Sequence, residues 1–223
     1  MSSSPRFQLK PATGIDFPSL IDLLWTSFES PLQGILRLFF PILDNDHPRS
    51  LQTCIDGQLE EYRTNQPQLM WVKVVDMQEN ERIVAGAKWF FYDRDPHGRT
   101  HSSEQGENSD KDKHEVANAN ADEETHLVAD WYPEGIAREF ATEAARQFER
   151  PREVMARGAH AFLHIAYTHP SYRNRGLAHL FLDWGLRIAD ERGLECWLDA
   201  SDMGAPLSKG ESDPGGEERV DGL

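Results

Sequence analysis

The stretch that decides the fold runs from residue 160 to residue 200 and reads HAFLHIAYT HPSYRNRG LAHLFLDWGLRIADER G LECWLDA. Its first nine residues, His160–Thr168, are almost all apolar or aromatic, which predicts a buried strand, and Pro170 ends it. A helix is predicted from about Gly176 to Glu191, because apolar residues recur there at helical spacing and Gly193 follows as a C-cap. The next strand is predicted over 194–199. Strand, helix and strand in this order form a βαβ unit with two parallel strands.

The turn between the first strand and the helix carries the chemistry. It combines a strand end, two arginines (Arg173 and Arg175), a glycine at the helix start (Gly176) and the small Ala178. A helix N-terminus offers unpaired backbone N–H groups and the positive end of the helix dipole. The turn therefore predicts an anion site suited to a pyrophosphate. It matches neither the Walker P-loop, since Gly-Lys-Ser/Thr is absent, nor the G-x-G-x-x-G dinucleotide fingerprint.

The residues before this unit predict further elements of an α/β domain. A first strand over 7–11 precedes a helix over about 16–29, with Asp16 at the N-cap position, and a second helix is predicted over about 48–63. The segments 70–76 and 82–91 are rich in β-branched and aromatic residues and predict an antiparallel hairpin. A helix over about 136–148 follows, and Pro151 either ends it or begins another turn.

Charge and composition are uneven along the chain. The net charge is −15, and nine of those charges fall in residues 101–124 and 208–223. Residues 93–124 hold almost no large apolar side chain, which predicts a disordered acidic insertion, and 208–223 predicts a disordered tail. The stretch 93–124 is either an insertion or a domain boundary; an insertion in a single domain over 5–207 is preferred, because neither flank has enough strands to close a core alone. The excess of acids argues against a nucleic-acid partner.

Other features narrow the class of protein. No apolar run approaches the roughly 20 residues that span a bilayer, so no membrane partner is expected. Two cysteines, Cys54 and Cys196, are too few for a disulfide framework or a zinc site, and a reducing, cytoplasmic location is the default, with the nucleus left open. His160, His164 and His169 are interpreted as core or turn residues and not as metal ligands.

The motif Arg173-x-x-Gly176-x-Ala178, placed between a Pro-terminated strand and an amphipathic helix, resembles the signature of the GCN5-related N-acetyltransferases, the GNAT superfamily. The resemblance extends over about residues 5–207. The segments WYPE at 131–134, THPSYR at 168–173 and LDAS at 198–201 resemble small-molecule acyltransferases of this superfamily from filamentous fungi. The fold that this implies is an α/β GNAT-like acyl-CoA N-acyltransferase fold, with a mixed central sheet flanked by helices.

The resemblance also implies a site and a reaction. Acetyl-CoA would be the co-substrate, with no metal, and its acetyl group would pass directly to a small-molecule amine. Asp199 is the candidate catalytic base. The expected cofactor-binding residues are those of the strand end and the turn: Ala166, Tyr167, Thr168, Arg173, Asn174, Arg175, Gly176, Leu177 and Ala178.

The C-terminal residues leave alternatives open. The family often takes its general acid from a Tyr after Pro-Leu, whereas Ser208 follows Pro206-Leu207 here, and the residues beyond show no apolar periodicity. The family's last strands are therefore predicted to be missing. The alternative to an active enzyme is a truncated, weak or inactive relative that binds CoA or a protein partner; a plain nucleotide-binding protein is a poorer third reading. Neither the acceptor nor the oligomeric state follows from the sequence.

Overall fold

The computed structural model describes residues 5–96 and 127–199. Its elements are β1 (Phe7–Pro11), the 3₁₀ turn η1 (Gly14–Asp16), α1 (Phe17–Glu29), α2 (Gly34–Phe39), α3 (His47–Thr64), β2 (Leu69–Asp76), β3 (Arg82–Tyr92), α4 (Ile136–Met155), β4 (His160–Thr168), the 3₁₀ turn η2 (Pro170–Tyr172), α5 (Leu177–Arg192) and β5 (Glu195–Leu198).

The described strands form one mixed sheet in the order β1-β2-β3-β4-β5. The neighbours β1 to β4 pair antiparallel, and β4 pairs with β5 in parallel. Both the predicted hairpin and the predicted βαβ unit are confirmed. They form because β2, β3 and β4 carry near-continuous apolar residues, which suits strands covered on both faces.

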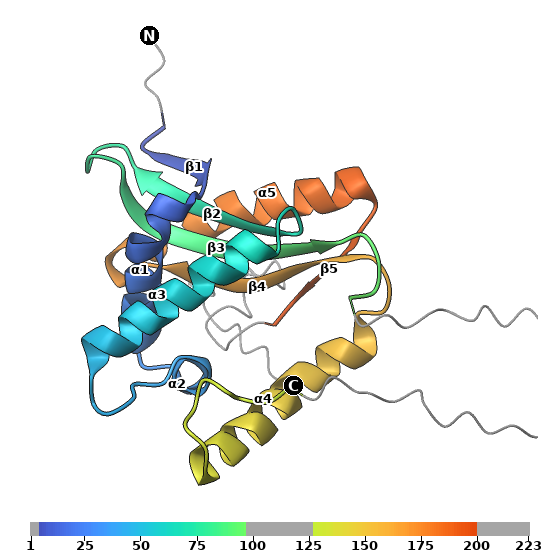
Figure 1. Ribbon diagram of the computed structural model, residues 1–223. Helices are drawn as coiled ribbons and strands as arrows, with labels where there is room; N and C mark the ends of the chain where they lie inside the picture. The colour runs from blue at the N-terminus through green and yellow to red at the C-terminus, as the bar shows by residue number, and fades with distance from the viewer. Residues whose placement is uncertain (1–4, 97–126, 200–223) are drawn as a thin grey trace, which may run out of the picture.

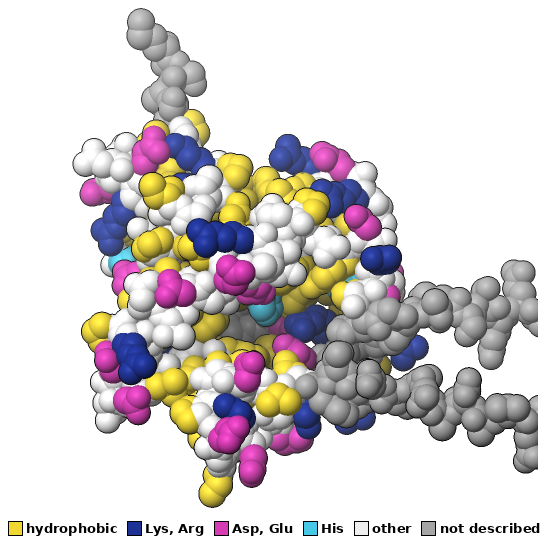
Figure 2. Space-filling view, viewed as in Figure 1, with side chains coloured by type: hydrophobic (Ala, Val, Ile, Leu, Met, Phe, Trp, Pro, Cys, Tyr) yellow, Lys and Arg dark blue, Asp and Glu magenta, His cyan; other side chains and the backbone are white. Residues whose placement is uncertain are grey.

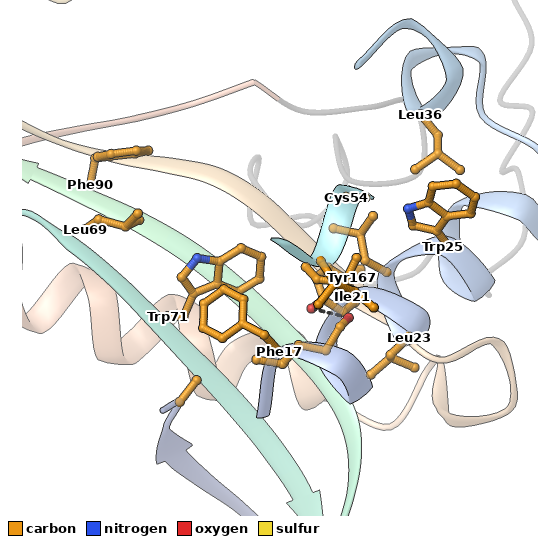
Figure 3. Packing of buried hydrophobic residues seen from close by; sticks show 14 of the residues in the cluster. Phe17, Ile21, Leu23, Trp25, Leu36, Cys54, Leu69, Trp71, Phe90 and Tyr167 are labelled. Atoms are coloured by element: carbon orange, nitrogen blue, oxygen red, sulfur yellow. Dashed lines mark hydrogen bonds between the residues drawn. The ribbon is translucent and has the colours of Figure 1, made fainter. Parts of the chain in front are cut away.

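Helices cover both faces of this sheet (Figure 1). The helices α1 and α3 lie on one face, and α5 lies across the other, which divides the interior into two apolar cores. On the α1 face, Phe17 packs edge-on against Trp71 with ring centroids 5.6 Å apart. The buried Tyr167 of β4 donates a hydrogen bond of 2.8 Å to the Leu20 carbonyl oxygen and so ties α1 to the sheet (Figure 3). The helix α1 is held over β4 by both apolar burial and this one buried polar contact.

On the opposite face α5 approaches the sheet closely at one glycine. A Cβ placed on Gly185 would overlap the indole ring of Trp89, which is fully buried. The helix can therefore lie flat on β3 only because position 185 has no side chain. This close approach sets the height at which the N-terminus of α5 meets the end of β4.

The sequence-based interpretation was incomplete around α2 and α4. The short helix α2 was not predicted, and α4 continues through Pro151 to Met155 instead of ending there. Trp131 and Tyr132 connect the two helices, since the indole Nε1 donates to the Leu38 carbonyl (2.9 Å) and the phenol to the Arg37 carbonyl (2.6 Å). Phe39 of α2 also packs against Trp131 and against Phe148 of α4, so the two helices lie against each other.

The start of α1 also differs in detail. Asp16 stands at the N-cap position as predicted, but its carboxylate accepts from the Thr13 amide (2.8 Å) and from Lys73 (2.5 Å), not from a helix amide.

Several expectations concern parts of the chain that the structure does not describe. The acidic insertion lies mostly in 97–126, and the tail and the expected loss of the last strands lie after 199, outside the described residues. No helix among residues 5–96 and 127–199 has the length and apolar character needed to cross a membrane.

Candidate functional site

The junction between β4 and α5 is built from a sharply turning backbone. After Thr168, the imidazole Nδ1 of His169 accepts the Ser171 amide (3.1 Å) and shapes η2. Asn174 and Gly176 then adopt left-handed conformations, with φ of 57° and 73°. Asparagine and glycine tolerate this region better than other residues, which explains why the chain can turn here directly into α5.

This turn leaves a run of backbone amides available. Among the described residues, the amides of residues 174–178 donate no hydrogen bond, and the Arg173 amide makes only a long one of 3.5 Å to the Pro170 carbonyl. Asn174, Arg175 and Gly176 are exposed, so neither burial nor their own side chains close the turn. Five open N–H groups at the positive end of a 16-residue helix are a donor set of the kind that favours an anion.

The two arginines of the motif bind backbone carbonyls close to this turn. The Arg173 guanidinium donates to the carbonyl oxygens of Ser30 (2.6 Å) and Ser27 (2.7 Å) at the end of α1. Arg175 donates to the Ser171 carbonyl (3.0 Å) and lies over the Tyr172 ring. Both side chains thus hold the loop in place through backbone carbonyls and the Tyr172 ring.

The strand β4 has a free edge next to this turn. Pairing between β4 and β5 covers only His160–Leu163 against Glu195–Leu198. From His164 to Thr168, no described strand lies beside β4 on its β5 side, although β3 pairs with the other side. A register shift opposite Lys88 and Trp89 makes His164 a bulged residue at the point where the two strands part. A ligand's amide groups can pair with this edge.

A cluster of charged side chains lies on the α1 face close to that point. Asp199, directly after β5, lies 3.5 Å from the Nη1 atom of Arg152 in α4. Burial raises the pKa of Asp199, and the opposing effect of Arg152 is weaker. Asp199 is therefore a carboxylate that takes a proton more readily than an ordinary aspartate.

Behind this pair lies a buried lysine. The Nζ atom of Lys88, only 1% exposed, lies 2.6 Å from Glu61 Oε2 and 3.2 Å from Gln58 Oε1 of α3. His164 is held neutral, because burial together with the charges of Lys88 and Arg152 places its pKa well below the usual value. The cluster thus contains one paired cation, one loosely paired cation and one neutral imidazole.

Sequence reasoning missed most of this cluster. It singled out Asp199, and it treated His164 only as a core residue. A signal for Lys88 exists, since a lysine inside the apolar run 83–91 must find a buried partner. No local pattern marks Arg152 as part of the cluster, because Phe162 in β4 and Asp199 after β5 are distant in sequence and only Glu149 is a neighbour on its own helix.

The histidines do not gather. Among the described residues no group of three His, Cys, Asp or Glu side chains is placed to hold a metal ion. His160 contacts the Gly158 carbonyl, and His169 shapes η2.

A polar pocket of about 560 Å³ opens between α1 and the ends of β2 and β3 near His169, and the Lys73–Asp16 ion pair lines it.

Comparisons with known proteins agree with this geometry. A model of the acetyltransferase (GNAT) family matches residues 100–205. No curated protein matches the chain. A structure titled histone acetyltransferase HPA2 and related acetyltransferase, from Corynebacterium glutamicum, is 20% identical, with a TM-score of 0.50 over 92% of this chain and 83% of that one. A GCN5-related N-acetyltransferase from Ralstonia eutropha is 13% identical, also with a TM-score of 0.50, over 97% and 98%.

These likenesses establish the architecture. The Corynebacterium and Ralstonia structures share the fold of this chain at low sequence identity, and the family match covers the segment that contains β4, α5 and β5. The described residues therefore have the α/β fold of the GNAT acetyltransferases, and the model of that family matches slightly less than half of the chain.

Proposed function

We propose that this chain is an acetyl-CoA-dependent N-acetyltransferase that transfers the acetyl group directly to a small amine. One observation carries the proposal: an open set of backbone amides at the N-terminus of α5 directly follows a strand edge that β5 leaves unpaired. The open amides can hold a diphosphate, and the unpaired strand edge can pair with an extended chain that carries amide groups. Acetyl-CoA contains both parts in this order.

The residues then have distinct roles. The amides from Arg173 to Ala178 bind the pyrophosphate, and the backbone of Ala166, Tyr167 and Thr168 pairs with the pantetheine arm. The acetyl thioester lies at the fork between β4 and β5, near the bulge at His164. Backbone N–H groups of this bulge polarise the thioester carbonyl as negative charge develops on its oxygen.

Transfer requires that protons as well as the acetyl group move. Asp199 takes one proton from the acceptor's ammonium group, which leaves a neutral amine. The amine nitrogen attacks the thioester carbon and a C–N bond forms; the C–S bond then breaks and CoA leaves as a thiolate. The second nitrogen proton passes to this thiolate, so that the products are an amide, CoA and one proton for the solvent.

Binding of acetyl-CoA is tested first. A ligand at a hundred times its Kd raises the free energy of unfolding by about 2.7 kcal/mol, which a thermal melt detects readily. The variant Asn174→Asp adds one negative charge at the amide site while keeping the side chain's size and its tolerance of a left-handed backbone. At a separation of several ångströms, partly screened by water, this repulsion is on the order of 1 kcal/mol, a loss of roughly five-fold in affinity.

A matched control exists in the chain. Asn80 also has a left-handed backbone, with φ of 52°, but it lies in the turn between β2 and β3. Asn80→Asp should leave acetyl-CoA affinity unchanged. Equal effects of the two variants, or no stabilisation by acetyl-CoA at all, would contradict the proposal.

Turnover is tested second. Loss of thioester absorbance is preferable to a thiol reagent, because the exposed Cys196 would also react with such a reagent. Since only the carboxylate form of Asp199 accepts a proton, kcat/KM should rise with pH through the raised pKa of this group, and Asp199→Asn should abolish that limb. Stabilisation by acetyl-CoA without turnover of any amine would instead favour the inactive, CoA-binding relative.

A further inference from the structure

Three buried polar atoms without a hydrogen-bond partner surround the ring of Phe162. They are the Nη1 atom of Arg152, the Nδ1 atom of His164 and the indole Nε1 atom of Trp197. The Arg152 guanidinium lies 4.3 Å from the centre of the Phe162 ring, the His164 ring lies 5.6 Å from it, and Trp197 is its register partner across β4 and β5. Helix α4 and strands β4 and β5 thus each contribute one such atom.

Buried polar atoms of this kind call for a partner. Leaving a buried donor or acceptor unpaired costs about 1–3 kcal/mol, so native proteins satisfy nearly all of them with protein, water or ligand. Trp25, Trp71 and Trp89 also bury an unpaired indole nitrogen, but each is at most 2% exposed and lies within a core. His164 and Trp197 are partly exposed residues, as expected for the wall of a recess.

The molecular surface also has a recess between two groups of elements. Figure 2 shows a hollow between the part of the molecule formed by the sheet with α3 and the part formed by α2 and α4, with charged and histidine side chains at its edge. Arg152 belongs to α4 and His164 to β4, and the guanidinium group of the first and the ring of the second both lie against Phe162.

The orientation of Arg152 suits a carboxylate. A guanidinium stacked on an aromatic ring keeps its N–H edge in the plane, where it can donate two parallel hydrogen bonds to one carboxylate. Asp199 does not fill this role, because its oxygen lies 3.5 Å from Nη1, an ion pair without a hydrogen bond. The indole Nε1 of Trp197, on the strand next to Phe162, is a further N–H donor without a partner.

The charges around the recess favour a ligand that carries one positive and one negative group. Lys88 is neutralised by Glu61, and Arg152 lies between two carboxylates, with Nη1 3.5 Å from Asp199 and Nη2 3.7 Å from Glu149 of the same helix, both longer than a typical hydrogen bond. His164 is uncharged and therefore repels neither an ammonium nor a carboxylate. An acceptor with several positive charges would bring some of them close to Arg152 and Lys88. An acceptor with one ammonium and one carboxylate group can place the first against Asp199 and the second at the Nη1 atom of Arg152, which has no hydrogen-bond partner.

We infer that the acceptor of this enzyme is an α-amino acid or a closely similar zwitterion, whose carboxylate binds Arg152 and Trp197 while its ammonium group lies against Asp199. The inference rests on the proposed function, and it names the substrate class of the same site. Arg152 is then the residue that sets specificity, and Asp199 is both the ammonium ligand and the base. His164 accepts a hydrogen bond from the bound acceptor.

The decisive experiment compares each common α-amino acid with its own carboxamide in the full-length protein with acetyl-CoA. The carboxamide keeps the amine and the side chain and removes only the negative charge. For the preferred amino acid, kcat/KM should exceed that of its carboxamide by at least ten-fold. A carboxamide or a simple alkylamine that reacts equally well overturns the inference.

A matched pair of variants assigns this discrimination to Arg152. Arg152→Gln should raise KM for the amino acid by ten- to a hundred-fold, leave KM for the carboxamide within three-fold, and leave acetyl-CoA affinity unchanged. Arg150→Gln removes an exposed guanidinium two residues earlier on the same helix and should change none of these values. If Arg152→Gln retains the preference for the carboxylate, the assignment fails.

A binding measurement separates this inference from the proposed function. Calorimetric titration of the preferred amino acid into the protein saturated with free CoA, which cannot react, reports acceptor binding without turnover. Binding that Arg152→Gln removes supports the zwitterion site even if no acetylation is found. If acetyl-CoA binds and simple amines are acetylated but no amino acid binds, the proposed function stands and the inference is wrong.

Discussion

The close approach of α5 to the sheet permits a sharp test of the packing that positions the candidate site. The perturbation is Gly185→Ala, one added methyl group in the middle of α5. Its Cβ would overlap three atoms of the Trp89 indole, and Trp89 cannot move aside easily, because it is fully buried and stacks on Phe91 with ring centroids 5.8 Å apart. The natural control is Gly57→Ala in α3, where the new Cβ meets nothing within 4 Å.

The magnitude follows from two opposing terms. Alanine is preferred over glycine inside a helix by about 0.8–1.0 kcal/mol, and this gain applies to both positions. Overpacking a core costs about 1–3 kcal/mol, and a rigid neighbour places Gly185→Ala at the upper end of that range. We therefore expect Gly57→Ala to stabilise the protein by about 1 kcal/mol and Gly185→Ala to destabilise it by about 1–2 kcal/mol.

Denaturant unfolding followed by tryptophan fluorescence measures both. The midpoint should shift in opposite directions for the two variants with unchanged m-values, which is the sign of a change in stability alone. Adding Trp89→Phe to Gly185→Ala should recover part of the loss, because the smaller ring lacks the overlapping atoms, so the double-mutant cycle should show a favourable coupling. If Gly185→Ala is as stable as the natural protein, α5 does not lie at this height over β3.

Three further predictions concern the junction and the thiols. Gly176→Val forces a β-branched residue into a left-handed backbone and should cost about 1–3 kcal/mol in a thermal melt, although its side chain would meet open space; a neutral result would contradict the assigned φ of 73°. Tyr167→Phe removes the hydrogen bond to the Leu20 carbonyl and should cost about 0.5–1.5 kcal/mol in denaturant unfolding, and no loss would show that this contact is absent. Burial raises the pKa of the Cys54 thiol to about 11, so a disulfide reagent at mildly alkaline pH should label Cys196 first and Cys54 only on unfolding; rapid labelling of both thiols in the folded protein would refute this.

The success of sequence reasoning varied with the kind of feature. The strand over 160–168 and the helix that follows it were predicted to within a residue or two, because a buried strand, a proline stop and an apolar stripe are local patterns. Asp16 was placed correctly at the start of α1, yet its partners, Thr13 and Lys73, were not foreseen. For Pro151 the sequence left two outcomes open, the end of the helix or another turn, and α4 continues through it to Met155.

The candidate site shows the same division. The amides of residues 173–178 could be proposed from the sequence, because a helix N-terminus after a glycine presents N–H groups wherever the helix lies. The roles of Arg173 and Arg175 could not be proposed from the sequence. Their side chains bind carbonyls at the end of α1 and in η2 and not the open turn. Their charge alone suggested anion ligands, and only their contacts show that they support the loop.

The sequence by itself determined the βαβ unit and the exposed amides at its turn, because periodicity, proline and glycine act on neighbouring residues of one chain. Only the tertiary structure decided that Arg152, His164, Trp197 and Asp199 meet around Phe162. The physical reason is that such a meeting depends on a one-residue bulge in β4 and on how α4 and the end of β5 pack against that strand. Neither leaves a periodic trace in the residues, and a single step in register would turn His164 to the other face of the sheet.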